Sequence, residues 1–151
     1  MLDNCQTAKE RWGGVSQIID RWLQERQDML VHYCALSDSK SDPERGARLR
    51  KLCEIMVDYV SAGHFEIYDQ LIREGRDFGD EEALQAGARH FKEVDATTEA
   101  VLDFNDKYQE TDDLTALDAD LSGLGEALEA RFSAEDAMIA VLHNAHRDLV
   151  E

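Results

Sequence analysis

The stretch that decides the fold runs from residue 49 to residue 71 and reads LRKLCEIMVDYVSAGHFEIYDQL. Its apolar residues recur at steps of three and four, which is the spacing of one side of an α-helix. The residues on this stripe are Leu49, Leu52, Cys53, Met56, Val57, Val60, Gly63, His64, Ile67, Tyr68 and Leu71. The pattern predicts a helix of about six turns, with Gly63 and His64 pointing inward.

The segments before this stretch follow the same helical spacing. An apolar stripe over residues 15–34 predicts a first helix, and residues 3–12 are expected to form a short lead-in helix before a bend at Gly13 and Gly14. Residues 37–43 are expected to form a loop, because the Ser-Asp-Pro run at 41–43 supplies a cap and a first-turn proline for the next helix.

Two acidic turns divide the second half of the chain. Glycines at 75 and 79 end the helix of residues 49–71, and Asp80 followed by two glutamates predicts a capped start for a third helix. The Thr-Asp-Asp run at 111–113 predicts the start of a fourth helix, in which the glycines at 123 and 125 are the weak points.

This order of elements predicts the fold class. Four long amphipathic helices joined by short loops favour an all-α, up-and-down antiparallel four-helix bundle with a short N-terminal lead-in helix. A chain of 151 residues is long enough to bury one core, so we expect a single helical-bundle domain over residues 1–151. The sequence contains no internal repeat, low-complexity tract or interdomain linker.

The charge of the chain restricts its partners. Its 33 acidic and 16 basic side chains give a formal net charge of −17. Such a surface repels phosphate backbones, which makes direct binding of DNA or RNA unfavourable. It attracts a basic protein instead, including one whose own task is to bind DNA. The plainer interpretation is that the acidity keeps the protein soluble.

The cysteines and the hydropathy pattern indicate a cytoplasmic protein without a membrane partner. The three cysteines show no CxxC spacing, and Cys34 and Cys53 fall on apolar stripes, so they are expected to be reduced core thiols. No apolar run precedes the charged N-terminal residues, and nothing approaches the roughly 20 apolar residues of a membrane span.

Four polar residues fall on the inward stripes of the predicted helices. They are His64, Thr98, Asn105 and Glu135. An unpaired buried polar group costs ~1–3 kcal/mol, so such residues are normally paired. His64 and Glu135 are therefore expected to hydrogen-bond each other across the core, in a structural role.

The same two residues also permit a metal site, since helical bundles build di-iron centres from His and Glu side chains. Such centres need several ligands at three- or four-residue spacing, and no second histidine falls into register with His64. His143 and His146 lie three apart, but near the chain end, where they are expected to face solvent. We therefore expect no metal or other cofactor.

Nothing in the sequence favours catalysis. No Ser or Cys lies in a strand-to-helix elbow, because no strand is predicted. Gly13 and Gly14 are not followed by the lysine of a phosphate-binding loop. Paired carboxylates are abundant, but in a chain this acidic they do not single out an active site. The chain is expected not to be an enzyme.

Three blocks resemble the signature segments of the Rsd/AlgQ family of bacterial regulators. They are RWGG at residues 11–14 followed by IDRWL at 19–23, VDYVSAGHF at 57–65, and LGEALEARF at 124–132. The resemblance runs from Met1 to about Arg147, in the same order and over nearly the same length as in the family. The AlgQ branch is the most similar, through RWGGV at 11–15 and AVLHNAH at 140–146.

The resemblance implies an anti-sigma factor. Family members bind the carboxy-terminal domain of the housekeeping sigma factor, which reads the −35 promoter element, and sequester it from core RNA polymerase. A sigma domain that uses a basic helix-turn-helix on DNA offers a surface that an acidic helical partner can cover. The charge of the chain is consistent with this expectation.

Matched positions in these blocks give the expected partner-binding residues. They are Asp58, Asp20, Arg21, Tyr59, Ser61 and Phe65. Asp58 follows the inward Val57 and is expected to reach solvent, where it would pair with a sigma arginine. Tyr59, Ser61 and Phe65 also lie off the predicted core stripe, and aromatic residues often form the energetic centre of an interface.

Two other functions remain open on the sequence alone. One is a hemerythrin-like metal or redox sensor built on His64 and Glu135. The other is regulation of a different stress-signalling protein through the same acidic surface. Weak self-association through that surface is a further open possibility.

Overall fold

The computed structural model describes residues 8–39 and 43–150. Within these ranges the chain forms helices and the turns between them, without a strand. The elements are α1 (Ala8–Asp38), α2 (Arg45–Ala62), a π-helical turn η2 (Gly63–Ile67), α3 (Tyr68–Asp77), α4 (Glu81–Glu110), α5 (Leu117–Leu142), a 3₁₀ turn η3 (Asn144–His146) and α6 (Arg147–Val150). The predicted all-α class is confirmed.

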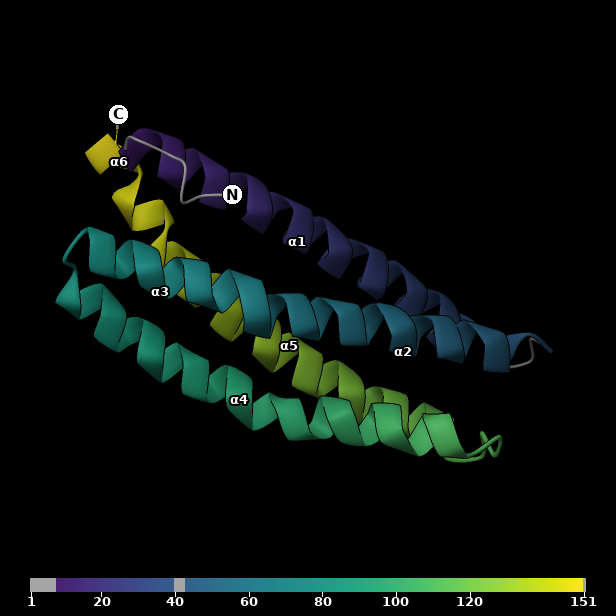
Figure 1. Ribbon diagram of the computed structural model, residues 1–151. Coiled ribbons are helices and arrows are strands. Elements are labelled where there is room, and N and C mark those ends of the chain that lie inside the picture. The colour runs from purple at the N-terminus through teal and green to yellow at the C-terminus, as the bar shows by residue number, and fades with distance from the viewer. Residues whose placement is uncertain (1–7, 40–42, 151) are drawn as a thin grey trace.

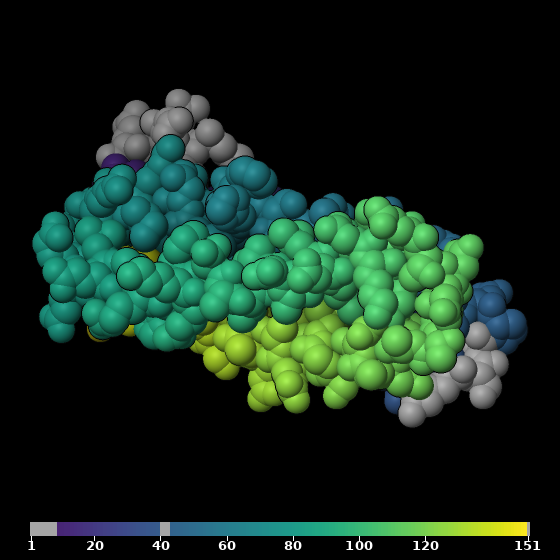
Figure 2. Space-filling model, turned by 90° about the horizontal axis from the view of Figure 1, so that it is seen from below, coloured from purple at the N-terminus to yellow at the C-terminus, as the bar shows by residue number. Residues whose placement is uncertain are grey.

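The long helices form an elongated up-and-down bundle (Figure 1). Helices α2, η2 and α3 follow one another as a single rod, which runs opposite to α1 and to α4, and α5 runs opposite to α4. The most extensive packing joins α4 to α5 and α1 to α2. Viewed from below, α4 lies across the molecule, with α5 along one edge and the α2–α3 rod along the other (Figure 2). The predicted antiparallel four-helix bundle is confirmed.

The glycines interrupt the helices less than the sequence predicted. Helix α1 continues from Ala8 through Gly13 and Gly14, so a lead-in separated by a bend is wrong for residues 8–12, and residues 3–7 lie outside the described part of the chain. Helix α5 likewise continues through Gly123 and Gly125. A glycine inside a helix costs only ~1 kcal/mol relative to Ala, which packing of the surrounding turns offsets.

Helix boundaries follow the predicted caps in one case and not in the other. Asp80 caps α4 as predicted, since its carboxylate accepts a hydrogen bond from the Ala83 backbone N–H at 3.0 Å. Helix α5 begins at Leu117 and not at residues 111–113, because Thr111 and Asp113 bond to nearby backbone N–H groups and form a turn. Of the predicted cap at 41–43, residues 41 and 42 lie outside the described residues, and α2 begins at Arg45.

The π-helical turn η2 is the main departure from the predicted regular helix. A Cβ on Gly63 would lie 2.9 Å from Trp22 Cζ2 and 3.2 Å from Tyr68 Oη, so both aromatic rings pack directly on this glycine. A π turn inserts one extra residue into the helix and changes which residues face the core on each side of it. His64 is therefore exposed, where the sequence predicted an inward position.

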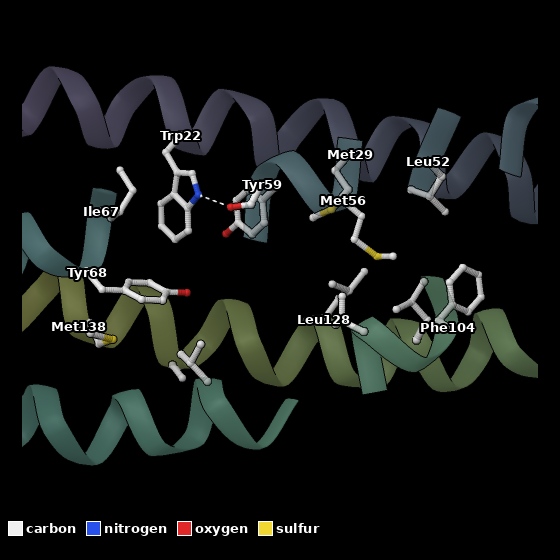
Figure 3. Close-up of a cluster of buried hydrophobic side chains, with 14 of the residues drawn as sticks. Trp22, Met29, Leu52, Met56, Tyr59, Ile67, Tyr68, Phe104, Leu128 and Met138 are labelled. Carbon is white, nitrogen blue, oxygen red and sulfur yellow. Dashed lines mark hydrogen bonds between the residues drawn. The ribbon is translucent and has the colours of Figure 1, made fainter. Parts of the chain in front are cut away.

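The core stripe of α2 also differs from the prediction by one position. Tyr59 is 0% exposed, whereas it was predicted to face outward, and Val57 is 38% exposed, whereas it was predicted to face inward. The rings of Trp22 and Tyr59 stack with centroids 4.7 Å apart, and the Trp22 indole N–H donates to the Tyr59 carbonyl at 3.0 Å (Figure 3). Tyr59 thus takes the inward position next to Val60, which is half-buried, and the stripe turns away from Val57.

The cysteines differ in burial. Cys53 is 6% exposed in the core, as expected, and burial raises the pKa of its thiol to about 11. Cys34 is exposed, so the expectation of a core thiol is wrong there. The buried residues of α1 nearest to it are Met29 and Leu36, which lie on the opposite side of the helix. Cys5 lies outside the described residues.

None of the described helices is both long and apolar enough to cross a membrane.

Candidate protein-binding surface

The outward side of α2 presents a line of polar and aromatic side chains. Glu54, Asp58, Ser61 and Phe65 follow one another at steps of four, three and four residues, which places them on one side of the rod. Asp58 and Glu54 are exposed and Ser61 is half-buried. Phe65, which η2 carries, is 78% exposed. We call this line the α2 ridge.

A groove lies on each side of the α2 ridge. The groove toward α1 has a volume of about 420 Å³ and is lined by Glu25, Asp28, Val31, His32, Lys51, Ile55 and Asp58. The groove toward α4 has a volume of about 500 Å³. Among the described residues, Asp58 is the one that lines both grooves. A partner that fills either groove therefore contacts this carboxylate.

The acidic groups on the α1 side of the ridge influence one another. The pKa of Glu25 is raised, first by burial and then by the neighbouring charges of Asp58, Glu66 and Asp28. The three neighbouring carboxylates that raise the pKa of Glu25 create a negative potential around it. A cationic side chain placed among them would relieve the repulsion, so this region favours a basic partner.

Large apolar side chains are exposed on the same face. Val31 is 57% exposed and lines the groove toward α1, and Val57 is 38% exposed and lines the groove toward α4. Together with Phe65 they supply apolar contact area among the acidic groups. Exposed apolar residues rimmed by charges are typical of protein-interaction sites.

The structure brings only some of the predicted partner-binding residues to this surface. Asp20 and Arg21 are exposed on α1, and Arg21 lines a smaller hollow of about 210 Å³ with Glu25 and Glu66. Tyr59 does not belong to the surface, because it is fully buried and its hydroxyl donates to Glu135 at 2.6 Å. The apolar Val31 and Val57 were not predicted, since isolated valines give no sequence signal of exposure.

Glu135 lies at the centre of a buried polar network. The hydroxyls of Tyr59 and Tyr68 each donate to one of its carboxylate oxygens. Arg26 and Arg131 each place a guanidinium nitrogen 3.3 Å from the carboxylate. Arg131 is 1% exposed. Burial is the largest influence on Glu135 and raises its pKa, while the tyrosines and arginines oppose that effect.

The other predicted buried polar residues have different environments. Asn105 is 7% exposed, and Thr98 is half-buried while its neighbour Thr97 is the buried threonine. Both threonine hydroxyls contact the Arg131 guanidinium, at 3.3 and 3.1 Å. His64 is exposed and does not pair with Glu135, because the π turn directs it away from the core.

The histidines near the end of the chain are buried, contrary to the prediction that they face solvent. His143 is 2% exposed, and its Nδ1 lies 2.8 Å from a Glu74 carboxylate oxygen. The Trp12 ring stacks on His143 with centroids 4.3 Å apart. His146 is 1% exposed and pairs through Nε2 with Asp80 at 2.9 Å. These contacts join α1, α3 and the start of α4 to the last turns of the chain.

The potential metal ligands do not converge. The pairing of His64 with Glu135, which motivated the metal alternative, is absent because one residue is exposed and the other is buried. Across residues 8–39 and 43–150, no group of three or more His, Cys, Asp or Glu side chains is placed to hold a metal ion.

Comparison with known proteins gives a consistent result. The model of a family described as regulators of the RNA polymerase sigma(70) subunit, Rsd/AlgQ, matches residues 1–143. A regulator of sigma D from Enterobacter sp. (strain 638) is 37% identical over 150 residues, covering 93% of this chain and 89% of that protein. The regulator of sigma D from Shigella dysenteriae serotype 1 is 35% identical over 156 residues, covering 97% of each. The chain therefore belongs to the Rsd/AlgQ family.

Proposed function

We propose that this protein is an anti-sigma factor. It binds the C-terminal, −35-reading domain of the housekeeping sigma factor and sequesters that domain from core RNA polymerase. The family description, which names the sigma(70) subunit, and the relatives called regulators of sigma D support this role. The role is regulatory, requires no catalysis and places the protein in the cytoplasm as one domain over residues 1–151.

The observation that carries the proposal is the position of Asp58. This exposed carboxylate lies on the α2 ridge between two grooves, with the apolar Val31 on one side and Val57 on the other. A basic helical segment laid along either groove brings a cationic side chain to Asp58 and apolar side chains to the valines. Charge speeds the encounter, and apolar packing provides the specificity.

The charge of the surface also determines which molecules the protein does not bind. A net charge of −17 opposes contact with a phosphate backbone, so we propose that the protein acts on the sigma domain without touching DNA. Self-association of the protein would have to bring two acidic ridges together. Any such association is therefore weak, increases with salt and competes with sigma binding.

The test is a titration of the isolated sigma domain with wild-type protein and with Asp58→Asn, which removes the charge but keeps the shape. We expect a one-to-one complex that weakens as salt rises, and a dissociation constant at least about tenfold higher for the variant. Glu126→Gln is the matched control, since Glu126 is an exposed acid on α5 outside both grooves. Absence of a wild-type complex at low salt would rule out the proposal.

A capture experiment separates the sigma domain from other basic partners. Wild-type protein and Asp58→Asn are used in parallel to capture proteins from cell extract. The proposal predicts that the housekeeping sigma factor is enriched by the wild type and depleted with the variant. Enrichment of a different protein, with the sigma factor absent from both samples, would instead favour regulation of that other protein.

A further inference from the structure

The groove between α2 and α4 has the features of a specific pocket. It combines a buried floor with an exposed rim. The floor contains Leu49, Cys53, Asn105 and Tyr108, which are 2%, 6%, 7% and 5% exposed. The rim includes Arg50, Glu54, Val57, Asp58, Gln109 and Asp112. A volume of about 500 Å³ is within the usual size range of ligand pockets and accommodates several side chains.

Asn105 on the floor has an unused hydrogen-bonding group. Its side-chain carbonyl oxygen is buried and has no hydrogen-bond partner among the described residues. Burial of an acceptor without a donor is unfavourable, and native proteins seldom leave one in that state. In the same protein, the buried Glu135 accepts two tyrosine hydroxyls. Because Asn105 lines the groove, an occupant that carries an N–H or O–H donor would supply the partner that this covered oxygen lacks.

The rim favours a basic occupant over an acidic or neutral one. Among the described lining residues, Glu54, Asp58 and Asp112 supply three carboxylates, whereas Arg50 is the one cationic group. Val57 adds an exposed apolar edge beside Asp58. A helix with an apolar side chain and a neighbouring basic side chain matches this combination, because the apolar group enters the groove while the cation stays at the rim.

We propose that this groove receives an apolar side chain from the basic segment of the sigma domain, and that a donor beside that side chain reaches Asn105. The inference rests on the proposed function and extends it, since it assigns the groove on the α4 side of the ridge as the docking pocket. Asp58 then forms the charged edge of the pocket. The groove on the α1 side supplies further contact area.

Two substitutions test the pocket without altering Asp58. Val57→Trp places a large ring at the mouth, at a position exposed enough to leave the core intact. Asn105→Leu removes the acceptor and keeps a similar volume. For each variant we expect at least about a tenfold rise in the dissociation constant for the sigma domain. Asn105→Leu should at the same time be as stable as the wild type or more stable, because it removes an unpaired buried polar atom.

The control is Leu149→Trp, which adds the same ring at a 66% exposed position on α6. It should bind the sigma domain like the wild type. If Asp58→Asn weakens binding while Val57→Trp and Asn105→Leu bind normally, the pocket is wrong and the proposed function stands. If the wild-type protein does not bind the sigma domain, the proposed function and the proposed pocket are both refuted. Circular dichroism spectra and thermal melts of each variant distinguish a loss of binding from a loss of the folded structure.

Discussion

Replacement of Arg131 by Met tests whether the buried ion pair with Glu135 stabilises the fold. The two side chains are 1% and 0% exposed, and the Arg131 Nε lies 3.3 Å from the Glu135 carboxylate. Arg131→Met keeps most of the apolar stem of the side chain but removes the guanidinium group and its charge. The carboxylate then keeps the two tyrosine hydroxyls and Arg26, but loses its one fully buried cation.

The expected loss in the free energy of unfolding follows from the burial of the Arg131–Glu135 pair. Removal of one partner from a buried ion pair typically costs about 3–5 kcal/mol, because the other charge is left without compensation. The loss of the contacts from Arg131 to Thr97 and Thr98 adds to this cost. With a urea m-value of about 2 kcal/mol/M, the midpoint of unfolding at neutral pH should fall by about 2 M.

The pH dependence of stability shows whether the unpaired Glu135 charge causes the destabilisation of Arg131→Met. Burial raises the pKa of Glu135, and Arg131 opposes the rise, so the pKa is higher still in Arg131→Met. Between its ordinary value of 4.5 and that raised value, the folded variant binds more protons than the unfolded chain. The stability of the variant therefore falls as pH increases through this window. The difference between wild type and variant should be smaller at pH 5 than at pH 8.

A double variant completes the experiment. Arg131→Met combined with Glu135→Gln removes both charges, and we expect it to be more stable at pH 8 than Arg131→Met alone. Glu129→Gln, an exposed glutamate on the same helix, should shift stability by less than about 0.5 kcal/mol. The reasoning is refuted if Arg131→Met unfolds within about 1 kcal/mol of the wild type, or if its deficit is independent of pH.

Two further substitutions test the π turn and the cap of α4. Gly63→Ala should destabilise the protein by ~1–3 kcal/mol, because the added Cβ meets Trp22. Gly13→Ala is the control and should stabilise the protein by ~0.5–1 kcal/mol, because no atom lies within 4 Å of the added Cβ. Thermal melts that rank the two variants the other way would contradict this prediction. The hydrogen bond to His146 is the main cause that lowers the pKa of Asp80 below its ordinary 3.8. Asp80→Asn, which still caps the helix, should therefore be less stable than the wild type at neutral pH, and the difference should vanish as pH falls below about 4; a difference that persists at low pH would show that the charge is not responsible.

The bundle itself was predictable because its signals are local. Apolar spacing of three and four residues defines the buried side of each helix, and Asp80 caps the start of α4 through a hydrogen bond from a residue three positions on. The exposed positions of Asp58 and Phe65 followed from the same periodicity. Each of these features depends on residues within one or two turns of one another.

The errors arose where distant residues decide the local structure. The π turn depends on two rings packed against Gly63, one of which, Trp22, belongs to another helix, and nothing in residues 49–71 signals that contact. The burial of His143 depends on Glu74 and Trp12, which are 69 and 131 positions away in the sequence. The periodicity predicts an outward Tyr59 because this residue lies off the three- and four-residue stripe, whereas its burial depends on Glu135, Arg26 and Trp22 on other helices.

The buried network and the proposed binding surface are physically connected through Tyr59. Its carbonyl accepts a hydrogen bond from Trp22, and its hydroxyl both donates to Glu135 and accepts from Arg26 at 2.9 Å. The backbone next to Asp58 is therefore held at two points by buried groups. A carboxylate on such a support loses little conformational freedom when a partner binds, and this preorganisation increases affinity without adding a contact. If the α2 ridge binds the sigma domain as proposed, the polar core contributes to binding through this rigid support as well as to the fold.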